Sequence, residues 1–159
     1  FMKNLKENLK VNLLPLFKEL IDGNTFSNIC VFCMQWGKKF PEKENTGILF
    51  VGKAVNGWIH KETDINILFG ESKDKIFARS DQMEWVHNLE KNNEIYNTNK
   101  SAFWRVVKKI SQNFYSKDEW FSYVAWSNLC KIAPFTGGNP NDKLYYEQLK
   151  CSQQILKRK

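Results

Sequence analysis

The amino-acid sequence predicts an α/β fold, more specifically a three-layer α/β/α domain with a parallel central sheet. Two short apolar runs, at 48–51 and 121–127, each lead into a polar loop that contains an Asn, which is typical of strands in such a sheet. Stretches with helical spacing of apolar residues lie before, between and after these runs, and this alternation favours parallel strands joined by helices. A length of 159 residues is usual for one domain, so we expect a single domain over 1–159.

The first 40 residues are predicted to form N-terminal helices. Apolar residues recur at helical spacing over 3–21, with Pro15 as the expected site of a kink and an Asp-Gly-Asn sequence as the end. Thr25 or Ser27 would cap a second helix over 29–36. A polar connector then leads to the first strand.

The predicted α/β core covers 45–159. Its first strand, 48–51, is expected to be buried on both faces because the run is continuously apolar. The last helix is expected to start at Asn141 or Asp142, and no strand follows it, so we expect that the C-terminal strands are missing from this domain. Between these elements the sequence predicts a short strand or loop at 65–69, helices at 80–91 and 101–115, and the second strand at 121–127.

Charge and composition narrow the class of partner. The formal net charge of +7 and the pI near 9.2 suit a phosphate-bearing partner, and we expect a nucleic acid. A hydrophobic content of 42% argues against disorder. No apolar run approaches the roughly 20 residues of a membrane span, and the start lacks the pattern of a signal peptide, so we expect no membrane and a cytoplasmic location.

The cysteines leave two interpretations open. Their spacing, a C-x2-C pair followed by two isolated residues, is not that of a zinc ribbon. Because the sequence shows no secretion signal, we do not expect disulfides. We expect no metal and no cofactor, with the thiols acting as small buried apolar groups. The alternative is an iron–sulfur cluster gathered from distant segments by Cys30, Cys33, Cys130 and Cys151.

The two strand-to-loop segments resemble motifs of the uracil-DNA glycosylase superfamily. Residues 52–57, G-K-A-V-N-G, resemble the family's Gly-rich turn after its first strand, such as G-Q-D-P-Y-H or G-E-A-P-G. Residues 128–134, N-L-C-K-I-A-P, are similar to the family's strand that ends in Asn before a Pro-containing loop. The likeness covers about residues 45–159. It implies hydrolytic release of a flipped uracil or related damaged base from DNA, as in base excision repair.

The resemblance also implies roles for individual residues. Asn56 would place the attacking water as the catalytic group, and Asn128 would read the base edge, because an amide offers both a donor and an acceptor. Stacking platforms would be Trp58 and Phe69. The other substrate-binding positions of the first loop are Gly52, Lys53 and Ala54, and the positions expected to approach the DNA backbone are Pro134, Gly137 and Gly138.

Two departures from the family pattern keep other functions open. Lys53 and Ala54 stand where some branches carry a carboxylate, and no His-Pro-Ser type loop follows the last helix. Asn56-Gly57 is also a common turn dipeptide, and Asn128 could simply close a strand end. The alternatives are therefore a non-catalytic nucleic-acid-binding α/β domain, or a domain that binds a small molecule or a protein.

Overall fold

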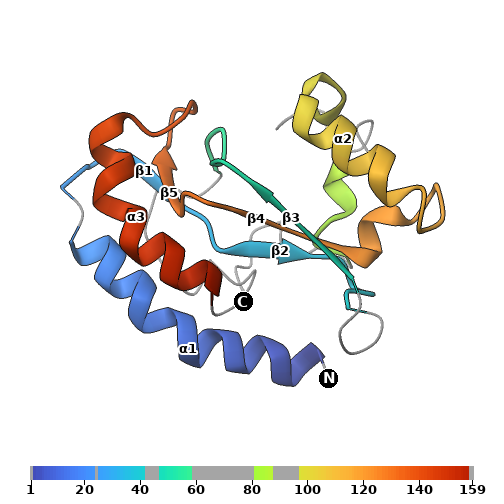
Figure 1. The fold of residues 1–159 in the computed structure, drawn as a ribbon, viewed down its shortest axis with the longest axis horizontal. Coiled ribbons are helices and arrows are strands. Elements are labelled where there is room, and N and C mark those ends of the chain that lie inside the picture. Colours follow the sequence, from blue (N-terminus) through green and yellow to red (C-terminus); the bar gives the residue numbers. More distant parts are fainter. Residues whose placement is uncertain (1, 24, 42–46, 59–80, 88–96, 158–159) are drawn as a thin grey trace. The chain divides into compact units, whose positions relative to one another are not determined.

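The computed structural model describes residues 2–23, 25–41, 47–58, 81–87 and 97–157, and its elements are of mixed α/β type (Figure 1). The helices are α1 (Met2–Asp22), α2 (Ala102–Ser111) and α3 (Asp142–Lys157). The strands are β1 (Ile29–Val31), β2 (Met34–Trp36), β3 (Ile48–Gly52), β4 (Val124–Asn128) and β5 (Ile132–Pro134). Short 3-10 turns are η2 (Glu84–Val86), η3 (Thr98–Lys100) and η4 (Trp120–Tyr123).

The chain divides into two compact units. The first contains Phe1–Met34, Val51–Glu71 and Ser127–Lys159, and the second contains Gln35–Phe50 and Ser72–Trp126.

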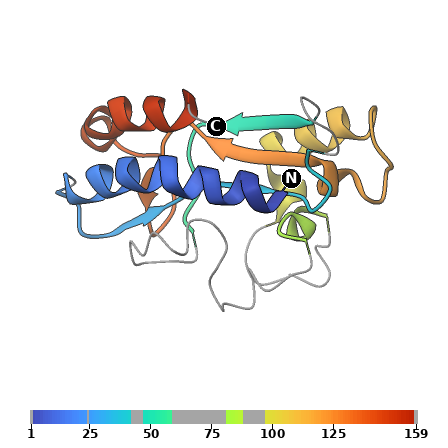
Figure 2. The same ribbon diagram turned by 90° about the horizontal axis from the view of Figure 1, so that it is seen from below.

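Helices α1 and α3 pack side by side in the first unit (Figures 1 and 2). The predicted first helix is confirmed, with Pro15 inside it and its end at Asp22. The start of α3 is confirmed as well, because Asn141 Oδ1 accepts a hydrogen bond from Leu144 N at 2.9 Å. The side chains buried at helical spacing are Leu13, Leu16, Phe17 and Leu20 of α1 and Leu144, Gln148, Cys151 and Ile155 of α3.

The second predicted helix, over 29–36, is wrong: this segment forms β1 and β2. Strand β1 pairs antiparallel with β5, with Ile29 opposite Pro134 and Val31 opposite Ile132. Every residue of 29–36 is buried. A short run that is apolar throughout fits a fully buried strand as well as a helix, and here burial on both faces favours the strand.

The outer side of β5 is completed by a side chain of α3. Gln148 Oε1 accepts from Ile132 N, and Gln148 Nε2 donates to Ile132 O, both at 2.8 Å. Gln148 and Ile132 are 1% and 0% exposed. The amide thus supplies the donor and the acceptor that a neighbouring strand would supply, which satisfies two buried backbone groups.

A three-stranded sheet has the order β2-β4-β3. All five residues of the central strand β4 are buried. Strands β3 and β4 lie side by side and point the same way (Figure 2). At the other side of β4, Gly37 N donates to Val124 O at 2.9 Å and continues the pairing in antiparallel direction, as does Lys39 N to Ser122 O. The pairing of the described strands is mixed, so the predicted parallel central sheet is not confirmed.

Strand β3 lies at the predicted position, but the prediction that both of its faces are buried is wrong. Its residues alternate in exposure, with Leu49 and Val51 38% and 42% exposed. Among the described strands, β3 has a neighbour on one side only, and an edge strand covered on one face shows this alternation.

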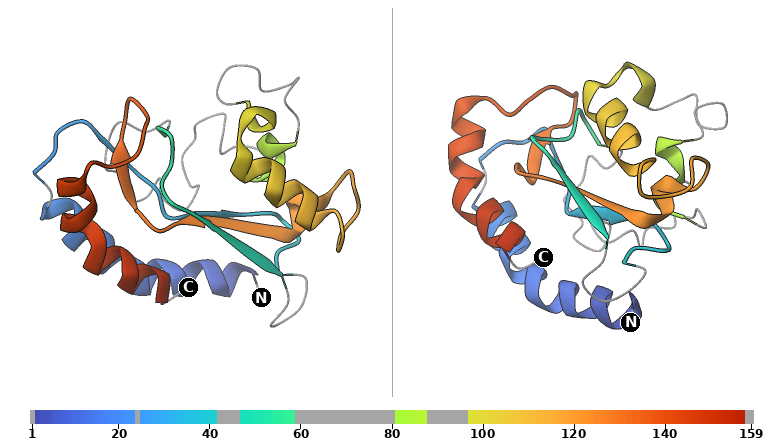
Figure 3. Two further views of the ribbon diagram at one scale, coloured as in Figure 1. Left: turned by 45° about the horizontal axis from the view of Figure 1, so that its top comes forward. Right: turned by 45° about the vertical axis from the view of Figure 1, so that its right-hand side comes forward.

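The second unit is built around α2. Ser101 Oγ accepts from Trp104 N at 3.3 Å and caps the helix, whose side chains Trp104, Val107 and Ser111 are buried. Figure 3 shows η2 and η4 close to α2. The predicted helix over 101–115 stops at Ser111, and Phe114 is 69% exposed. The helix expected at 80–91 is a 3-10 turn, η2, in its described part, while 88–91 and the stretch 65–69 lie outside the described residues.

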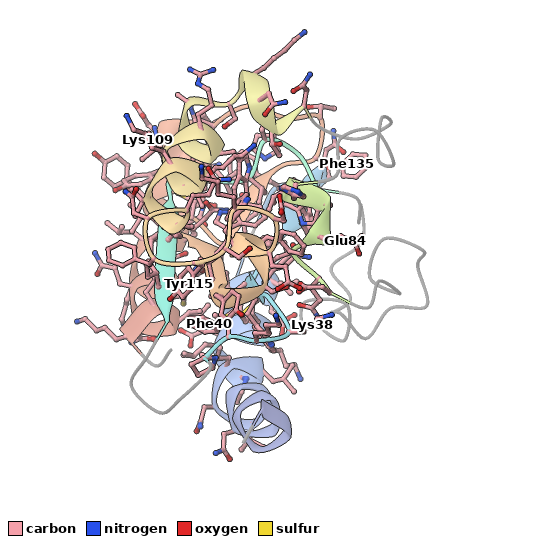
Figure 4. The ribbon with its side chains drawn as sticks, turned by 90° about the vertical axis from the view of Figure 1, so that its right-hand side faces the viewer. Lys38, Phe40, Glu84, Lys109, Tyr115 and Phe135 are labelled. Atoms are coloured by element: carbon pink, nitrogen blue, oxygen red, sulfur yellow. The ribbon has the colours of Figure 1, made fainter. Side chains whose placement is uncertain are left out.

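A buried carboxylate anchors the second unit. Asp81, 3% exposed, accepts from Ser122 Oγ at 2.5 Å, from Met83 N at 2.9 Å and from Lys38 N at 3.2 Å. These three donors satisfy both carboxylate oxygens and tie three segments together. Tyr115, which follows α2 and is labelled in Figure 4, stacks on Tyr123, and their ring centroids are 4.7 Å apart.

Candidate functional site

The carboxyl ends of β3 and β4 are joined by backbone hydrogen bonds. Leu129 N donates to Gly52 O and Cys130 N donates to Lys53 O, both at 2.8 Å. The predicted substrate positions Gly52 and Lys53 therefore lie directly beside the segment that follows Asn128. Loops at the carboxyl ends of parallel strands are the usual ligand sites of α/β sheets. All of these residues belong to the first unit.

The loop after β3 and the loop after β5 are packed closely together. Asn56 is exposed, and its Oδ1 accepts from Gly138 N at 2.7 Å. Gly57 and Gly137 have φ values of +79° and +97°, which favour glycine. A Cβ on Gly57 would lie 3.0 Å from Phe135 O, and one on Gly137 would lie 3.2 Å from Asn56 Oδ1. The predicted catalytic amide thus contacts the loop predicted to approach DNA.

The other predicted amide is in the interior. Asn128, at the end of β4, is 1% exposed, and its Nδ2 has no hydrogen-bond partner among the described residues. Its backbone oxygen accepts from the ammonium of Lys131. A buried donor without a partner costs about 1–3 kcal/mol, so this amide is the most unusual polar group of the candidate site.

Lys131 was not singled out by the sequence analysis. It is 0% exposed, and its Nζ also donates to Ser127 Oγ at 2.8 Å, while that hydroxyl donates to Cys33 O at 2.9 Å. The three donors of an ammonium can hold the β4 end and the following turn in one geometry. The only sequence signal is the position of the lysine within the apolar stretch L-C-K-I-A, because lysine is otherwise rarely buried.

Of the two aromatic residues predicted to stack on a base, one lies within the described residues. Trp58 is half-buried and meets Phe32 edge to face, with centroids 4.9 Å apart. Phe69 lies outside the described residues. Of the remaining predicted positions, Ala54, Pro134 and Gly137 are half-buried, whereas Lys53 and Gly138 are exposed.

The four cysteines are buried free thiols. Burial raises the pKa of Cys30 to about 11. Burial also raises the pKa of Cys130, against the opposing effect of the charges of Lys53 and Lys131. Within the described residues, no group of three or more His, Cys, Asp or Glu side chains is close enough to hold a metal ion. Cys30, Cys33, Cys130 and Cys151 are therefore not gathered into one such group in this structure.

The site combines an exposed amide, two glycine-rich loops, a buried amide donor and two lysines. Such a set can form hydrogen bonds to a polar ring and can attract an anionic backbone.

No helix in the described ranges is long and apolar enough to cross a membrane. Comparison of the chain with family models, curated proteins and solved structures found no match.

Proposed function

We propose that this chain is a uracil-DNA glycosylase-like protein that takes a flipped pyrimidine of DNA at the carboxyl ends of β3 and β4 and releases the base by hydrolysis. The observation that supports it most is the buried Nδ2 of Asn128, which has no hydrogen-bond partner within the part of the chain that the structure describes. A carbonyl oxygen of a pyrimidine would accept from this donor and remove the cost of leaving it unsatisfied.

The burial of Asn128 adds an opening step to the proposal. At 1% exposure, its amide is reached by a base only after neighbouring side chains have moved aside. Extruding a base costs a few kcal/mol, and less for a mismatched or single-stranded one. We therefore expect single-stranded uracil-containing DNA to be the better substrate.

The proposed hydrolysis depends on water held at Asn56. Residues 52–57 contain no carboxylate, and an amide orients water but does not take its proton. Base release would thus rely on stabilising the departing base, for which a positioned donor contributes about a hundredfold to a thousandfold in rate. The Nδ2 of Asn128 is the proposed donor.

The test is incubation of the full chain with single- and double-stranded oligonucleotides that contain one uracil, followed by alkaline cleavage of the abasic product. Asn128→Asp removes the donor in a side chain of the same shape, and we expect release to fall about a hundredfold or more. Asn99→Asp makes the same change at an exposed position and should leave release unaltered. Absence of any abasic product from the unaltered chain refutes the enzymatic function.

A second function, binding of nucleic acid without turnover, is favoured by the contact of Asn56. Its Oδ1 already accepts a hydrogen bond from Gly138 N, so this oxygen is engaged in joining the two loops. For such a function we expect labelled uracil-containing DNA to bind the chain in an anisotropy assay, with an affinity that falls steeply as the salt concentration rises and with no release of the base. Salt-insensitive or absent binding refutes it.

A further inference from the structure

Lys53 combines a fixed backbone with an exposed side chain at the proposed site. Its carbonyl accepts from Cys130 N at 2.8 Å, two residues after Asn128. The side chain is exposed, and among the described residues no ion pair or hydrogen bond engages its ammonium. A primary amine is therefore available next to the segment that carries the proposed base-reading amide.

The neighbouring lysine has the opposite character. Lys131 is 0% exposed and donates to Ser127 Oγ and to the backbone oxygen of Asn128, so its ammonium is committed to the fold. Only Lys53 of this pair is accessible to a bound DNA strand. Lys53 was predicted as a substrate-binding position, and it stands where some branches of the resembled family carry a carboxylate.

The two ammonium groups act on the same small region. Both lower the pKa of the Cys130 thiol, against the larger effect of burial. Both side chains therefore lie close enough to Cys130 for their charges to act on its thiol, and Lys53 is the exposed one of the two.

We propose that Lys53 is a nucleophile that forms a Schiff base with the sugar of an abasic site, which gives the chain a DNA lyase activity in addition to base release. The inference uses the proposed function for the place where DNA binds. It does not depend on Asn128 or on release of a base.

The proposed reaction begins with the open-chain sugar, whose C1′ is an aldehyde. The Nζ of Lys53 adds to C1′, and loss of water gives an iminium in which nitrogen is doubly bonded to C1′. The iminium makes the C2′ proton acidic, and this proton passes to water. The electron pair then forms the C2′–C3′ double bond while the C3′–O bond breaks, so that the phosphate leaves with its bonding pair. Hydrolysis of the iminium returns the free amine of Lys53.

The experiment supplies the abasic site directly, so that base release is not needed. The full chain is mixed with an oligonucleotide that carries one abasic site, in the presence of sodium cyanoborohydride, which reduces the iminium to a stable secondary amine. The adduct is measured on a denaturing gel, and its position is found by mass spectrometry of the digested protein. We expect one main adduct, on Lys53, and strand cleavage at the abasic site when the reductant is left out.

The matched variants separate the nucleophile from general electrostatic attraction. Lys53→Arg keeps the positive charge and removes the amine, and it should lose the adduct and the cleavage while binding of the DNA persists. Lys109→Arg makes the same change on the exposed face of α2 and should leave both unaltered. An adduct spread over many lysines, or one that survives in Lys53→Arg, overturns the inference. If no uracil is released but the adduct on Lys53 still forms, only the glycosylase function is refuted. If uracil is released but no adduct forms on Lys53, only the role of Lys53 is refuted.

Discussion

Replacing Gln148 by Leu should remove the side-chain hydrogen bonds that α3 makes to β5, while the sequence of β5 itself stays the same. The substitution deletes the 2.8 Å hydrogen bonds to Ile132 N and Ile132 O and leaves both groups inside the first unit. An unsatisfied buried group costs about 1–3 kcal/mol, so two of them cost about 2–6 kcal/mol. Burial of the leucine side chain returns about 1.5–3 kcal/mol. We expect a net loss of about 2 kcal/mol in the free energy of unfolding, taken from the middle of these ranges.

The assay is urea unfolding followed by tryptophan fluorescence, with the free energy extrapolated to water. The control is Gln153→Leu, which makes the same exchange at an exposed position of α3 and should stay within about 0.5 kcal/mol of the unaltered chain. Equal losses in the two variants, or a loss below 1 kcal/mol for Gln148→Leu, would refute the idea that this amide replaces a strand.

A glutamate at position 148 provides a pH-dependent version of the same test. A carboxylate accepts from Ile132 N, but its second oxygen faces Ile132 O, so only the protonated acid restores both hydrogen bonds. Burial and this contact raise the carboxyl pKa in the folded state above the unfolded value of about 4.3. The folded state then binds more protons than the unfolded state, so the stability of Gln148→Glu relative to the unaltered chain should fall as the pH rises above about 4. A difference that is independent of pH contradicts the assignment.

Three further predictions concern a buried hydroxyl, a helix cap and a thiol. Ser122→Ala removes a donor to the buried Asp81 carboxylate and should lower the free energy of unfolding by about 1.5–3 kcal/mol in the same urea assay. Asn141→Ala removes the cap of α3 and should cost about 1 kcal/mol, seen as a lower midpoint in thermal melts followed by circular dichroism. Because burial raises the pKa of Cys30 to about 11, iodoacetamide should label it slowly in the folded chain at neutral pH and rapidly in urea, as read by mass spectrometry; equal rates would contradict its burial.

The sequence was most informative where one local signal dominates. Helix α1 was predicted with its interior Pro15, and α3 was predicted with its cap at Asn141, because apolar spacing and capping chemistry act within a few residues. Strands β3 and β4 were located because each apolar run is short and leads into a loop. Each of these predictions uses a signal that can be recognised within a short stretch of consecutive residues.

The errors arose where partners distant in sequence decide the structure. Residues 29–31 form a strand because they pair with β5, about 100 positions away, and residues 34–36 form a strand because β2 lies beside β4. No local signal reports either pairing. The exposure of Leu49 and Val51 arises because one face of β3 is left uncovered, and the continuous apolar sequence of the strand does not report this.

The sequence identified the two loops of the candidate site but not the contacts between them. The two loops were identified from glycine and Asn, but the hydrogen bond from Gly138 to Asn56 joins positions 82 residues apart. The full burial of Lys131 runs against the usual preference of lysine for water, so sequence rules would place it on the surface.

The close fit of the two glycine loops has a consequence for how the protein can change over evolution. Since a side chain at Gly57 would collide with the backbone at Phe135, and one at Gly137 would press on Asn56, neither segment can gain bulk independently. Sequence changes in 53–57 and 134–138 should therefore be inherited as matched pairs in relatives of this chain, and a new specificity at this end of the sheet would need coordinated substitutions in both.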